Sequence, residues 1–514
     1  MQAATSQPRP DGSAFGLVGR VRVLLPPKAR VGAAVTGFAG VSIGAFLWYS
    51  LSIHAEGSDA SSSPLLALCL LVGVGAAYGA WFGYSSWAAR HFGVDTGTLL
   101  QADSYSFLPM LSLWLYLFQV PPTLSSAPAI AAAALLIMAA VKLAIAARYS
   151  DIARSISVVF VATRVPLMLI APLAAIVIGQ RQGHHFSPAH GVLLDVWGRW
   201  DAQHYLDIAT QGYHGKDIAF FPLYPFLIHI VGDLIGDHLV AGLLISNIAF
   251  LGALAFLYAL VKLEFGDNSV AFHAIFYVAI FPTAIFFSAV YTESLFLMLT
   301  VASVYFARRG NFMTSGVFGA LASMTRVEGI LTALPLAYEV WRAWRERRGT
   351  TLARGAAGLA IVPLGIGAYM FYLYALQGDP LAFSKVQAEW DRHFAPPWIS
   401  IANTIQAIAT PPFTSGTANH IIELVFTLAF LILMVVAFRQ LRPSYAWYFA
   451  ASLLMPMCTA SLMSMPRFVL VVFPAFMLLA LWGRRPAVNS AIVSFCLPVL
   501  GLFTVLFADW YWLA

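Results

Sequence analysis

Long apolar segments separated by short polar ones recur along the whole chain. Most approach the ~20 residues that a helix needs to cross a bilayer, so each is predicted to be a membrane span. From this pattern we expect spans at about 31–53, 64–88, 105–120, 127–147, 157–179, 239–260, 270–289, 294–307, 359–376, 421–438, 445–463, 468–482 and 491–508.

One apolar stretch does not fit a simple series of crossings. Only ~30 residues lie between Arg309 and Arg342, too few for two full spans at a rise of 1.5 Å per residue. We expect a hairpin of two half-length helices with its tip at 325–329, held inside the protein rather than against lipid. The chain is therefore predicted to be an all-α polytopic membrane protein with about 13–15 membrane-crossing segments.

Lysine and arginine set the predicted orientation of these spans. A basic cluster immediately precedes the first span, so the positive-inside rule places the N-terminus in the cytoplasm. Alternating crossings then put the polar loops on the external face and the C-terminus outside. The predicted organisation is a cytoplasmic tail at 1–30, N-terminal spans at 31–180, a first external loop with amphipathic helices at 181–238, and further spans at 239–514 that include an external loop at 377–420.

Composition excludes an ordinary soluble domain. The chain is 60% hydrophobic and only 10% charged, whereas soluble domains are roughly 25% charged. The net charge of +6 resides mainly at helix ends, so no nucleic-acid partner is predicted. Cys69, Cys458 and Cys496 lie inside apolar runs, which argues against a disulfide framework and against a thiolate metal site.

The run 197–225 (WGRWDAQHYLDIATQGYHGKDIAFFPLYP) is unusually polar and aromatic for this chain. Asp201, His204 and Tyr205 are three or four residues apart, so on a short helix they share one face. Such a helix at the membrane interface would present a carboxylate to the head of a lipid-linked substrate. The alternative is that Asp201 caps the helix or pairs with Arg199.

Two charged residues near the ends of apolar spans also need a partner or a ligand. A charge at the centre of a spanning helix costs ~2.5–3.5 kcal/mol on insertion scales, so charged residues that adjoin apolar spans, as Glu293 and Arg326 do, usually have a partner or a ligand. They either bind a ligand or form an internal ion pair, in which Glu328 is a further partner for Arg326. Arg467 either extends to the interface or binds a phosphate with its planar set of donors.

Metal and nucleotide sites are not indicated. The histidines of the first external loop lack the spacing of known zinc motifs, and no glycine-rich phosphate loop is present. No cofactor and no metal site are predicted, with a divalent metal left open. Lys385 and Arg392 in the second external loop are either solvated cations or further contacts for an anion.

Several motifs together resemble one known family. The ordered set of motifs is similar to that of the PIG-V-like mannosyltransferases, the family of GPI mannosyltransferase II. These motifs are RWDA (199–202), HY (204–205), AFFPLYP (219–225), YTESLF (291–296), TRVEG (325–329) and SMPRF (464–468).

This resemblance implies a GT-C type fold and an inverting glycosyltransferase that uses a polyprenyl-phosphate sugar, usually mannose, on the external side of the membrane. It also implies that Asp201 is the catalytic base. We expect the other site residues to bind the substrates: cations Arg326, Arg467, Lys385 and Arg392 at the phosphate, Glu293 and His204 as orienting groups, Trp200, Phe221 and Tyr224 along the sugar or lipid groove, and Arg199 and Tyr205 beside them.

The predicted protein is thus a multi-pass plasma (cell) membrane enzyme. Its expected partners are a polyprenyl-phosphate sugar donor, a lipid or glycan acceptor, and membrane lipids. The family resemblance does not fix the acceptor, because several spans precede the first motif. Two alternatives remain: a transporter or flippase of lipid-linked sugars, and a GT-C transferase for another sugar such as arabinofuranose.

Overall fold

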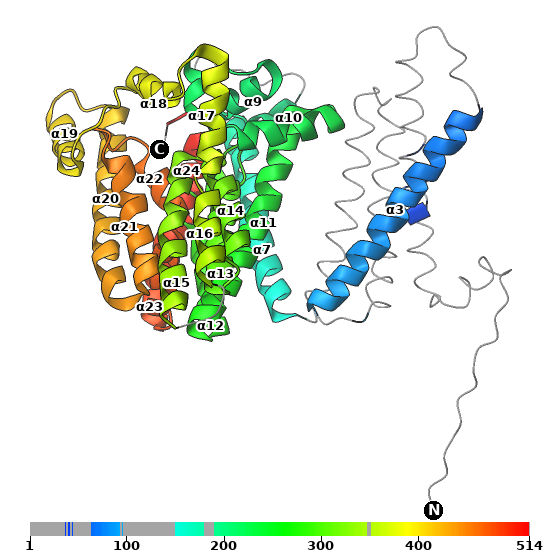
Figure 1. The fold of residues 1–514 in the computed structure, drawn as a ribbon. Helices are drawn as coiled ribbons and strands as arrows, with labels where there is room; N and C mark the ends of the chain where they lie inside the picture. Colours follow the sequence, from blue (N-terminus) through cyan, green and yellow to red (C-terminus); the bar gives the residue numbers. More distant parts are fainter. Residues whose placement is uncertain are drawn as a thin grey trace, which may run out of the picture. The chain divides into compact units, whose positions relative to one another are not determined.

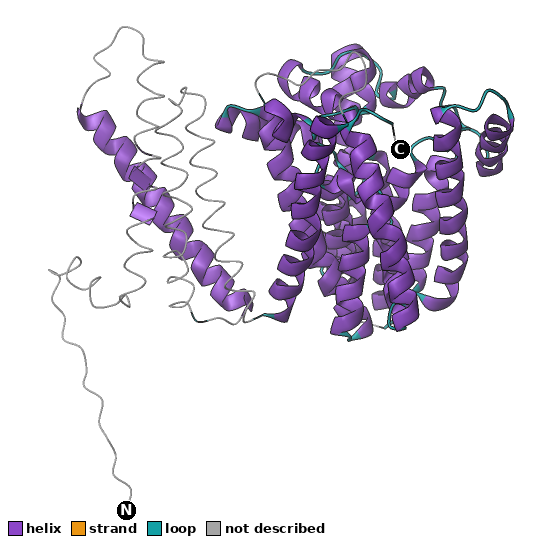
Figure 2. Cartoon of the chain, turned by 180° about the vertical axis from the view of Figure 1, so that it is seen from behind, coloured by secondary structure: helices purple, strands orange, loops and turns teal. Residues whose placement is uncertain are grey.

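The computed structural model describes residues 36–37, 40–41, 44, 63–92, 95, 150–178, 190–346 and 351–512. Every regular element within these residues is a helix and none is a β-strand, which confirms the predicted all-α class (Figure 1, Figure 2). The chain divides into two compact units, Met1–Arg154 and Ser155–Ala514. The predicted tail at 1–30 and the predicted spans at 31–53, 105–120 and 127–147 lie wholly or largely outside the described residues.

The first unit is described mainly by α3, Ser63–Phe92, which covers the span predicted at 64–88. Glycines bring this helix into backbone contact with the segment before it. A Cβ placed on Gly73 would overlap the backbone nitrogen of Gly44 and the carbonyl oxygen of Gly40. Small residues permit this close packing in membranes, where van der Waals contact and hydrogen bonds replace the hydrophobic effect between helices.

The second unit is a bundle of helices with shorter elements at one end. Its first half contains α7 (Asp151–Val177), α8 (Gly191–Asp195), α9 (Asp201–Gln211), η3 (Gly215–Ala219), α10 (Leu223–Ile235), α11 (His238–Phe265), α12 (Asn268–Ile280), η4 (Ala284–Phe287), α13 (Glu293–Arg308), α14 (Phe312–Thr325), η5 (Val327–Thr332) and α15 (Ala333–Arg345). Its second half contains α16 (Thr351–Ile361), α17 (Leu364–Gln377), α18 (Ala382–Lys385), η6 (Val386–Trp390), α19 (Pro397–Ala409), α20 (Ser415–Gln440), α21 (Pro443–Met457), α22 (Met465–Phe468), η7 (Val469–Val471), α23 (Phe473–Trp482) and α24 (Pro486–Ala508).

Five described helices are long and apolar enough to cross a membrane, which supports the multi-pass class. A sixth is present if Met465–Val471 and Phe473–Trp482, bent by 74°, form one broken span. The five are Asp151–Val177, His238–Phe265, Leu352–Gln377, Ser415–Gln440 and Pro486–Ala508.

Other predicted spans are shorter helices inside the bundle. The helices α12 and α13, in the spans predicted at 270–289 and 294–307, have 13 and 16 residues, lengths that rise only ~20–24 Å against a hydrocarbon core of ~30 Å. The predicted total of 13–15 crossings stays a prediction, since much of the N-terminal part lies outside the described residues.

Two Gly-Asp pairs form the turns at either end of α11. Gly236 and Gly266 end the preceding helices at φ 77° and 67°, the left-handed region that glycine adopts without a Cβ penalty. The aspartate that follows each glycine then caps the next helix. Asp237 accepts from the backbone N–H of Val240, at 3.0 Å.

The predicted hairpin of half-length helices is confirmed. It consists of α14 and α15, and its tip lies where α14 ends at Thr325 and η5 begins. Gly329 packs directly on α14, because a Cβ there would overlap the backbone of Ala322 and Ser323. The tip therefore returns against its own first helix, inside the protein.

A buried arginine of α7 stabilises the break between α12 and η4. The guanidinium of Arg164, 1% exposed, donates to the carbonyl oxygens of Ala279 (2.5 Å) and Ala284 (2.7 Å) and to the hydroxyl of Ser288 (3.3 Å). These carbonyls lie where the helical hydrogen-bond ladder ends, and an unpaired carbonyl in an apolar interior is costly. Arg164 thus supplies the partners that let the chain turn at this point.

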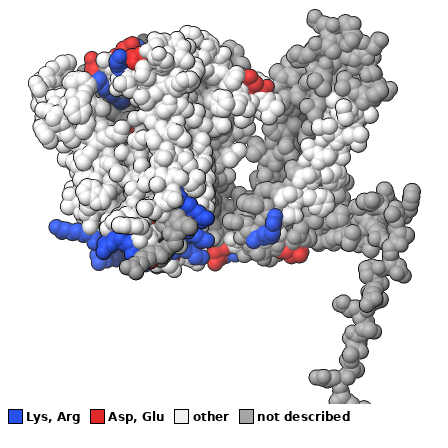
Figure 3. Space-filling view, viewed as in Figure 1, with Lys and Arg blue, Asp and Glu red and all other residues white. Residues whose placement is uncertain are grey.

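Basic residues gather at one end of the second unit. Figure 3 shows this end as a blue band along the lower edge of the bundle. The helix termini there carry Lys262, Arg308, Arg309, Arg342, Arg345, Arg439, Arg442, Arg484 and Arg485. The elements α9, α18 and α19 lie at the opposite end (Figure 1).

Part of this basic end is an internal ion-pair network. Arg308 of α13 contacts Glu264 of α11 at 2.5 Å and the hydroxyl of Tyr445 in α21 at 3.0 Å. Arg442 bonds Glu339 of α15 at 2.8 and 3.0 Å. The network ties four helices together at the end away from α9.

We predict that Gly329→Ala lowers the thermal stability of the protein in detergent. The added methyl has no room against the backbone of α14, and overpacking of this kind costs about 1–3 kcal/mol. The melting temperature is expected to fall by about 3 °C or more. Gly367→Ala is the matched control, since a Cβ at Gly367 meets nothing within 4 Å; equal melting temperatures for the two variants would contradict the predicted packing.

Candidate functional site

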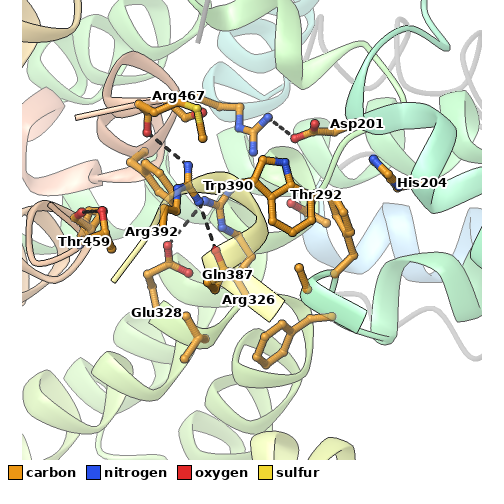
Figure 4. Close-up of a pocket in the computed structure, with 18 of the residues that line it drawn as sticks. Asp201, His204, Thr292, Arg326, Glu328, Gln387, Trp390, Arg392, Thr459 and Arg467 are labelled. Carbon is orange, nitrogen blue, oxygen red and sulfur yellow. Dashed lines mark hydrogen bonds and ion pairs between the residues drawn. The ribbon is translucent and has the colours of Figure 1, made fainter. Parts of the chain in front are cut away.

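A cavity of about 840 Å³ lies at the end of the second unit opposite the basic helix termini. Its walls come from α9, η3, η5, η6, the segment between α21 and α22, and the residues after α24 (Figure 4). The polar and charged side chains along it are Asp201, Gln203, His204, Tyr205, Thr292, Thr325, Arg326, Glu328, Ser384, Gln387, Arg392, Thr459, Ser464 and Arg467.

The start of α9 presents Asp201 to this cavity. Asp201 is the first residue of the helix, and Asp201, His204 and Tyr205 all line the cavity, as their spacing predicts. The preceding residue, Trp200, has φ 58° and ψ −125°, a backbone conformation that is strained for a residue with a side chain. Strain of this kind persists only where surrounding structure enforces it, and here it sets where α9 begins.

Asp201 forms an ion pair with Arg467. Its Oδ2 atom lies 2.5 Å from Nη1 of Arg467, across 266 residues of sequence (Figure 4). The side chain of Asp201 is 19% exposed and that of Arg467 is 10% exposed, so the pair is largely withdrawn from bulk water. The predicted alternative partner of Asp201, Arg199, does not take this role.

A buried glutamate lies between two of the cavity's arginines. Oε1 of Glu293 is 2.9 Å from Nη1 of Arg326 and 3.1 Å from Nε of Arg467. Glu293 is completely buried, and Arg326 also lies 3.5 Å from Glu328. The predicted internal ion pair of Glu293 with Arg326 is therefore present, and it is shared with Arg467.

Arg392 is the least compensated cation of the cavity. Its guanidinium donates to the amide oxygen of Gln387 (3.4 Å) and to the carbonyl oxygen of Met463 (3.3 Å), with no ion pair to a carboxylate among the described residues. Burial, and after it the nearby charge of Arg467, lower the pKa of Arg392 to about 10. A group with these surroundings is stabilised by any anion that enters the cavity.

The backbone around Arg467 is fixed by two polar contacts from other parts of the bundle. Thr283 donates to the carbonyl oxygen of Pro466 at 2.9 Å, and Glu423 accepts from the backbone N–H of Ser464 at 3.3 Å. Ser464 itself has φ 71°. The turn that carries Arg467 is thus positioned by α20 and by the segment between α12 and η4.

His204 forms a second polar contact along α9. Its Nδ1 atom lies 2.7 Å from Oδ1 of Asp217 in η3, and its ring stacks on Phe220 at 4.6 Å. Tyr205 packs edge-on against Phe220 and places its hydroxyl 3.4 Å from that of Thr292. These contacts hold η3 against α9 and fix the orientation of the imidazole.

The structure brings most of the predicted site residues together. The eight that line the cavity are Trp200, Asp201, His204, Tyr205, Phe221, Arg326, Arg392 and Arg467. Glu293 lies directly behind Arg326 and Arg467, where it contacts both guanidinium groups but is itself fully buried.

Three predicted residues lie outside the cavity wall. Tyr224 is fully buried in the core and bonds Ser246 at 2.6 Å and the carbonyl of Gly242 at 3.1 Å. Arg199 is 1% exposed and lies over the ring of Trp510. Lys385, whose side chain is 71% exposed, pairs with Asp379 at 2.7 Å. Tyr224 and Arg199 are thus buried in the core, and Lys385 lies at an outer surface.

Several cavity residues were not predicted from sequence. Trp510 and Trp512 follow the last span, and Gln387 lies in the second external loop outside the recognised motifs. Thr459 lies within the span predicted at 445–463, but the helix there, α21, ends at Met457. An aromatic run after an apolar helix was the available signal for the tryptophans. No comparable signal exists for the two polar residues.

One group of side chains in the described residues has the composition of a metal site, outside the cavity. The ligand atoms of His229, Asp233 and His238 lie within 4.8 Å of one another at the turn between α10 and α11. His238 is 3.0 Å from Asp233, so the cluster is also satisfied as a hydrogen-bonded pair. It lacks the deep burial that the cavity's charged residues share.

Comparison with known proteins confirms the resemblance indicated by the motifs. Residues 187–363 match the model of the family described as mannosyltransferase (PIG-V). GPI alpha-1,6-mannosyltransferase 2 of Cricetulus griseus is 29% identical over 34% of this chain and 39% of its own length. The Homo sapiens protein of the same name is 30% identical over 27% of this chain and 31% of its own length. The match thus spans well under half of these relatives.

A solved structure shows a more distant likeness. The archaeal oligosaccharyltransferase AglB from Archaeoglobus fulgidus, in complex with an inhibitory peptide and a dolichol-phosphate, is 14% identical with a TM-score of 0.31. The superposition covers 67% of this chain and 55% of the archaeal chain. A TM-score of this size is too low to establish a shared fold.

We predict that Arg392→Ala weakens binding of a polyprenyl phosphate more than Lys385→Ala does. Arg392 lies in the cavity and has no carboxylate partner in the described part of the chain, whereas Lys385 lies outside the cavity and is paired with Asp379. Loss of a charged hydrogen bond of ~1.5–3 kcal/mol corresponds to a dissociation constant raised about ten-fold or more.

The measurement is the affinity of the purified protein for a short-chain polyprenyl phosphate in detergent. Lys385→Ala serves as the control of equal charge change and is expected to stay within about two-fold of the unsubstituted protein. Equal losses in the two variants would show that the cavity cations do not bind the phosphate.

Proposed function

We propose, from the relationship of residues 187–363 to the PIG-V mannosyltransferases, that this membrane protein is an inverting glycosyltransferase. It transfers a sugar, most simply mannose, from a polyprenyl-phosphate donor to an acceptor hydroxyl. The observation that carries the proposal is the Asp201 carboxylate at the start of α9, held by Arg467 in a cavity that also contains Arg326 and Arg392.

In this reaction Asp201 is the general base. Its carboxylate takes the proton of the acceptor hydroxyl as that oxygen attacks the anomeric carbon of the donor sugar. A new C–O bond forms on one face of the sugar, and the bond from the anomeric carbon to the phosphate oxygen breaks on the other face. The configuration inverts, and polyprenyl phosphate leaves with the bonding electron pair.

The three arginines are placed to stabilise that leaving group. Negative charge grows on the phosphate as the bond breaks, and preorganised cations in a partly dry site lower the barrier to this change. Arg326 and Arg467 are held in place by Glu293, and Arg392 by Gln387 and the carbonyl oxygen of Met463. The guanidinium groups therefore require little reorganisation when the donor arrives.

The ion pair between Asp201 and Arg467 has a consequence for the order of binding. A carboxylate fully paired with arginine is a poorer base than one whose partner is shared with another anion. The donor phosphate competes with Asp201 for Arg467, so that donor binding frees the carboxylate to accept the proton of the acceptor hydroxyl. The carboxylate then becomes active only when a sugar donor is present.

The cavity is proposed to face the external side of the cell membrane. The support is the band of lysine and arginine at the opposite end of the bundle, which the positive-inside rule assigns to the cytoplasm (Figure 3). Both substrates would then be lipid-linked or membrane-associated molecules that meet the cavity from the outer leaflet.

We predict that Asp201→Asn abolishes sugar transfer while leaving the fold intact, because Arg467 keeps its ion pair with Glu293. The amide is nearly isosteric with the carboxylate but cannot accept the proton, and loss of general-base catalysis costs about 10²–10⁴-fold in rate. The measurement is transfer from a synthetic polyprenyl-phosphate mannose in detergent, where a transporter would give no product.

Asp207→Asn is the matched control for this variant. Asp207 lies on the same helix, two turns from Asp201, and does not line the cavity. Its substitution is expected to keep most of the activity. Full activity of Asp201→Asn, in a protein with an unchanged melting temperature, would overturn the assignment of the base.

We also predict opposite accessibility for two cysteine variants made in a background without Cys69, Cys458 and Cys496. Gln406→Cys on α19 is expected to react with a membrane-impermeant maleimide in intact cells. Arg439→Cys in the last turn of α20 is expected to react only after permeabilisation, because it lies at the basic end. The reverse pattern would place the cavity on the cytoplasmic side.

A further inference from the structure

The helix α19 exposes an unusually apolar surface at the edge of the second unit (Figure 1). Trp398 on this helix is 67% exposed, and Phe394 and Phe413, which precede and follow the helix, are 87% and 72% exposed. Residues 393–422 contain no aspartate, glutamate, lysine or arginine. Exposed apolar surface of this kind marks a contact with a membrane or with another protein.

The side chains of α19 divide into three faces. The first face is buried: Ser400 donates to the carbonyl oxygen of Met457 at 2.6 Å, and Thr404 lies one turn further along the same face. The second face is exposed and apolar, and it consists of Trp398, Ala402, Ile405 and Ala409. The third face carries the exposed polar residues Asn403 and Gln406. A helix at the boundary between lipid and water needs this division, because it meets protein, lipid and water on different sides.

The position of α19 in the bundle matches such a boundary. The helix packs against α20, one of the five helices that are long and apolar enough to cross a membrane. The 26 residues of α20 rise ~39 Å, more than a hydrocarbon core of ~30 Å, so the ends of α20 reach the head-group layers. Since α19 lies at the end of the bundle that holds the cavity, it lies at the level of one of these layers (Figure 1).

The exposed side of α20 is that of a helix in contact with lipid. Its exposed aliphatic residues recur every three or four positions, at Ile421, Val425, Leu428, Ile432 and Val435. The exposed Phe413 joins this stripe to α19, with no acidic residue, lysine or arginine between them. The apolar surface of α19 therefore continues, along the chain, the surface that α20 presents to lipid.

We infer that α19 is an interfacial helix that lies in the head-group layer of the membrane, at the end of the bundle that holds the cavity. Trp398 and Ile405 face the acyl chains, and Gln406 faces water. Tryptophan is suited to this layer because it combines an apolar ring with a polar N–H. The inference concerns contact with lipid and does not depend on the proposed transferase activity.

A protein partner fits this surface less well. Protein interfaces carry about one hydrogen bond per 100–200 Å² and a polar rim, whereas the apolar face of α19 offers one polar group, the indole N–H of Trp398. The chain also enters the second unit through α7, on the side of the bundle away from α19 (Figure 1, Figure 2). Lipid is therefore the occupant that the surface chemistry favours.

The position of α19 bears on the cavity as well. The side-chain amide of Asn403 donates to the carbonyl oxygen of Ala460 at 3.0 Å, and the backbone N–H of Ala395 donates to that of Cys458 at 3.1 Å. Thr459, between these two acceptors, lines the cavity. An α19 held in the head-group layer thus fixes this wall of the cavity at the depth where the phosphate of a lipid-linked molecule lies.

The test measures the membrane depth of a nitroxide label at Ile405→Cys and, as a matched control, at the neighbouring Gln406→Cys. The full chain without Cys69, Cys458 and Cys496 is reconstituted in vesicles of phosphatidylcholine and phosphatidylglycerol. Electron paramagnetic resonance then compares the access of oxygen and of a water-soluble nickel chelate to each label. The Ile405 label is expected to favour oxygen, at a depth of about 5–10 Å into the boundary between head groups and acyl chains. The Gln406 label is expected to favour the nickel chelate.

Two further labels calibrate the result. Ala402→Cys, on the apolar face, is expected to report the same environment as Ile405→Cys, and Val425→Cys on the stripe of α20 is expected to lie deeper than both. Equal access of the nickel chelate to the Ile405 and Gln406 labels would place the apolar face in water and overturn the inference. Shielding of the Ile405 and Ala402 labels from both reagents would also overturn it, because the first unit or a second copy would then cover the face. None of these measurements uses turnover, so a protein without transferase activity would refute the proposed function and leave this inference standing.

Discussion

The geometry of the cavity depends on Arg467, which is shared between two carboxylates. Asp201 comes from α9 and Glu293 from α13, and one guanidinium lies within 3.1 Å of both. Loss of Arg467 would leave both carboxylates without this partner, and an uncompensated charge in a broken buried ion pair costs about 3–5 kcal/mol. Arg467 therefore holds α9 against the bundle and sets the position of its first residue. The break of 74° between Met465–Val471 and Phe473–Trp482 is what brings this arginine into the interior.

The charged residues of the cavity occur where helices are interrupted. Glu293 is the first residue of α13, Arg326 lies between α14 and η5, and Arg467 lies in the short helix α22. Irregular backbone at membrane depth is tolerated only where protein or a polar cavity surrounds it, since lipid cannot satisfy the freed N–H and C=O groups. Arg164 satisfies two such carbonyls beside η4, and Thr283 satisfies that of Pro466. Hydrogen bonds from neighbouring elements thus stabilise the interruptions of the helices, and the charged residues of the cavity lie at these interruptions.

The sequence predicted those parts of the site that depend on segment length and residue spacing. The shortness of the apolar stretch before Arg342 predicted the α14–α15 hairpin, and the three- and four-residue spacing predicted the shared face of Asp201, His204 and Tyr205. What it did not predict depends on tertiary packing. Tyr224 belongs to a motif but points into the core, because a motif does not specify which way its helix is rotated.

The other surprises have the same origin. Arg164 lies in an apolar helix, and its role is visible only once the break after α12 is known. Trp510 and Trp512 come from the far end of the chain, and no local pattern connects them with Trp200. Burial and long-range pairing are properties of the folded chain, so residues that act through them cannot be found from spacing.

The charges of the cavity are balanced in a way that suits the proposed reaction. Asp201, Glu293 and Glu328 contribute −3, and Arg326, Arg392 and Arg467 contribute +3, so the cluster is neutral before the donor binds. A phosphodiester donor adds one negative charge. During transfer the acceptor proton neutralises Asp201 while the phosphate gains one negative charge, so the total stays the same. One negative charge therefore moves from Asp201 to the phosphate, which lies in the same cavity. A single guanidinium can follow this shift with a small displacement, and that keeps the electrostatic cost of reorganisation low.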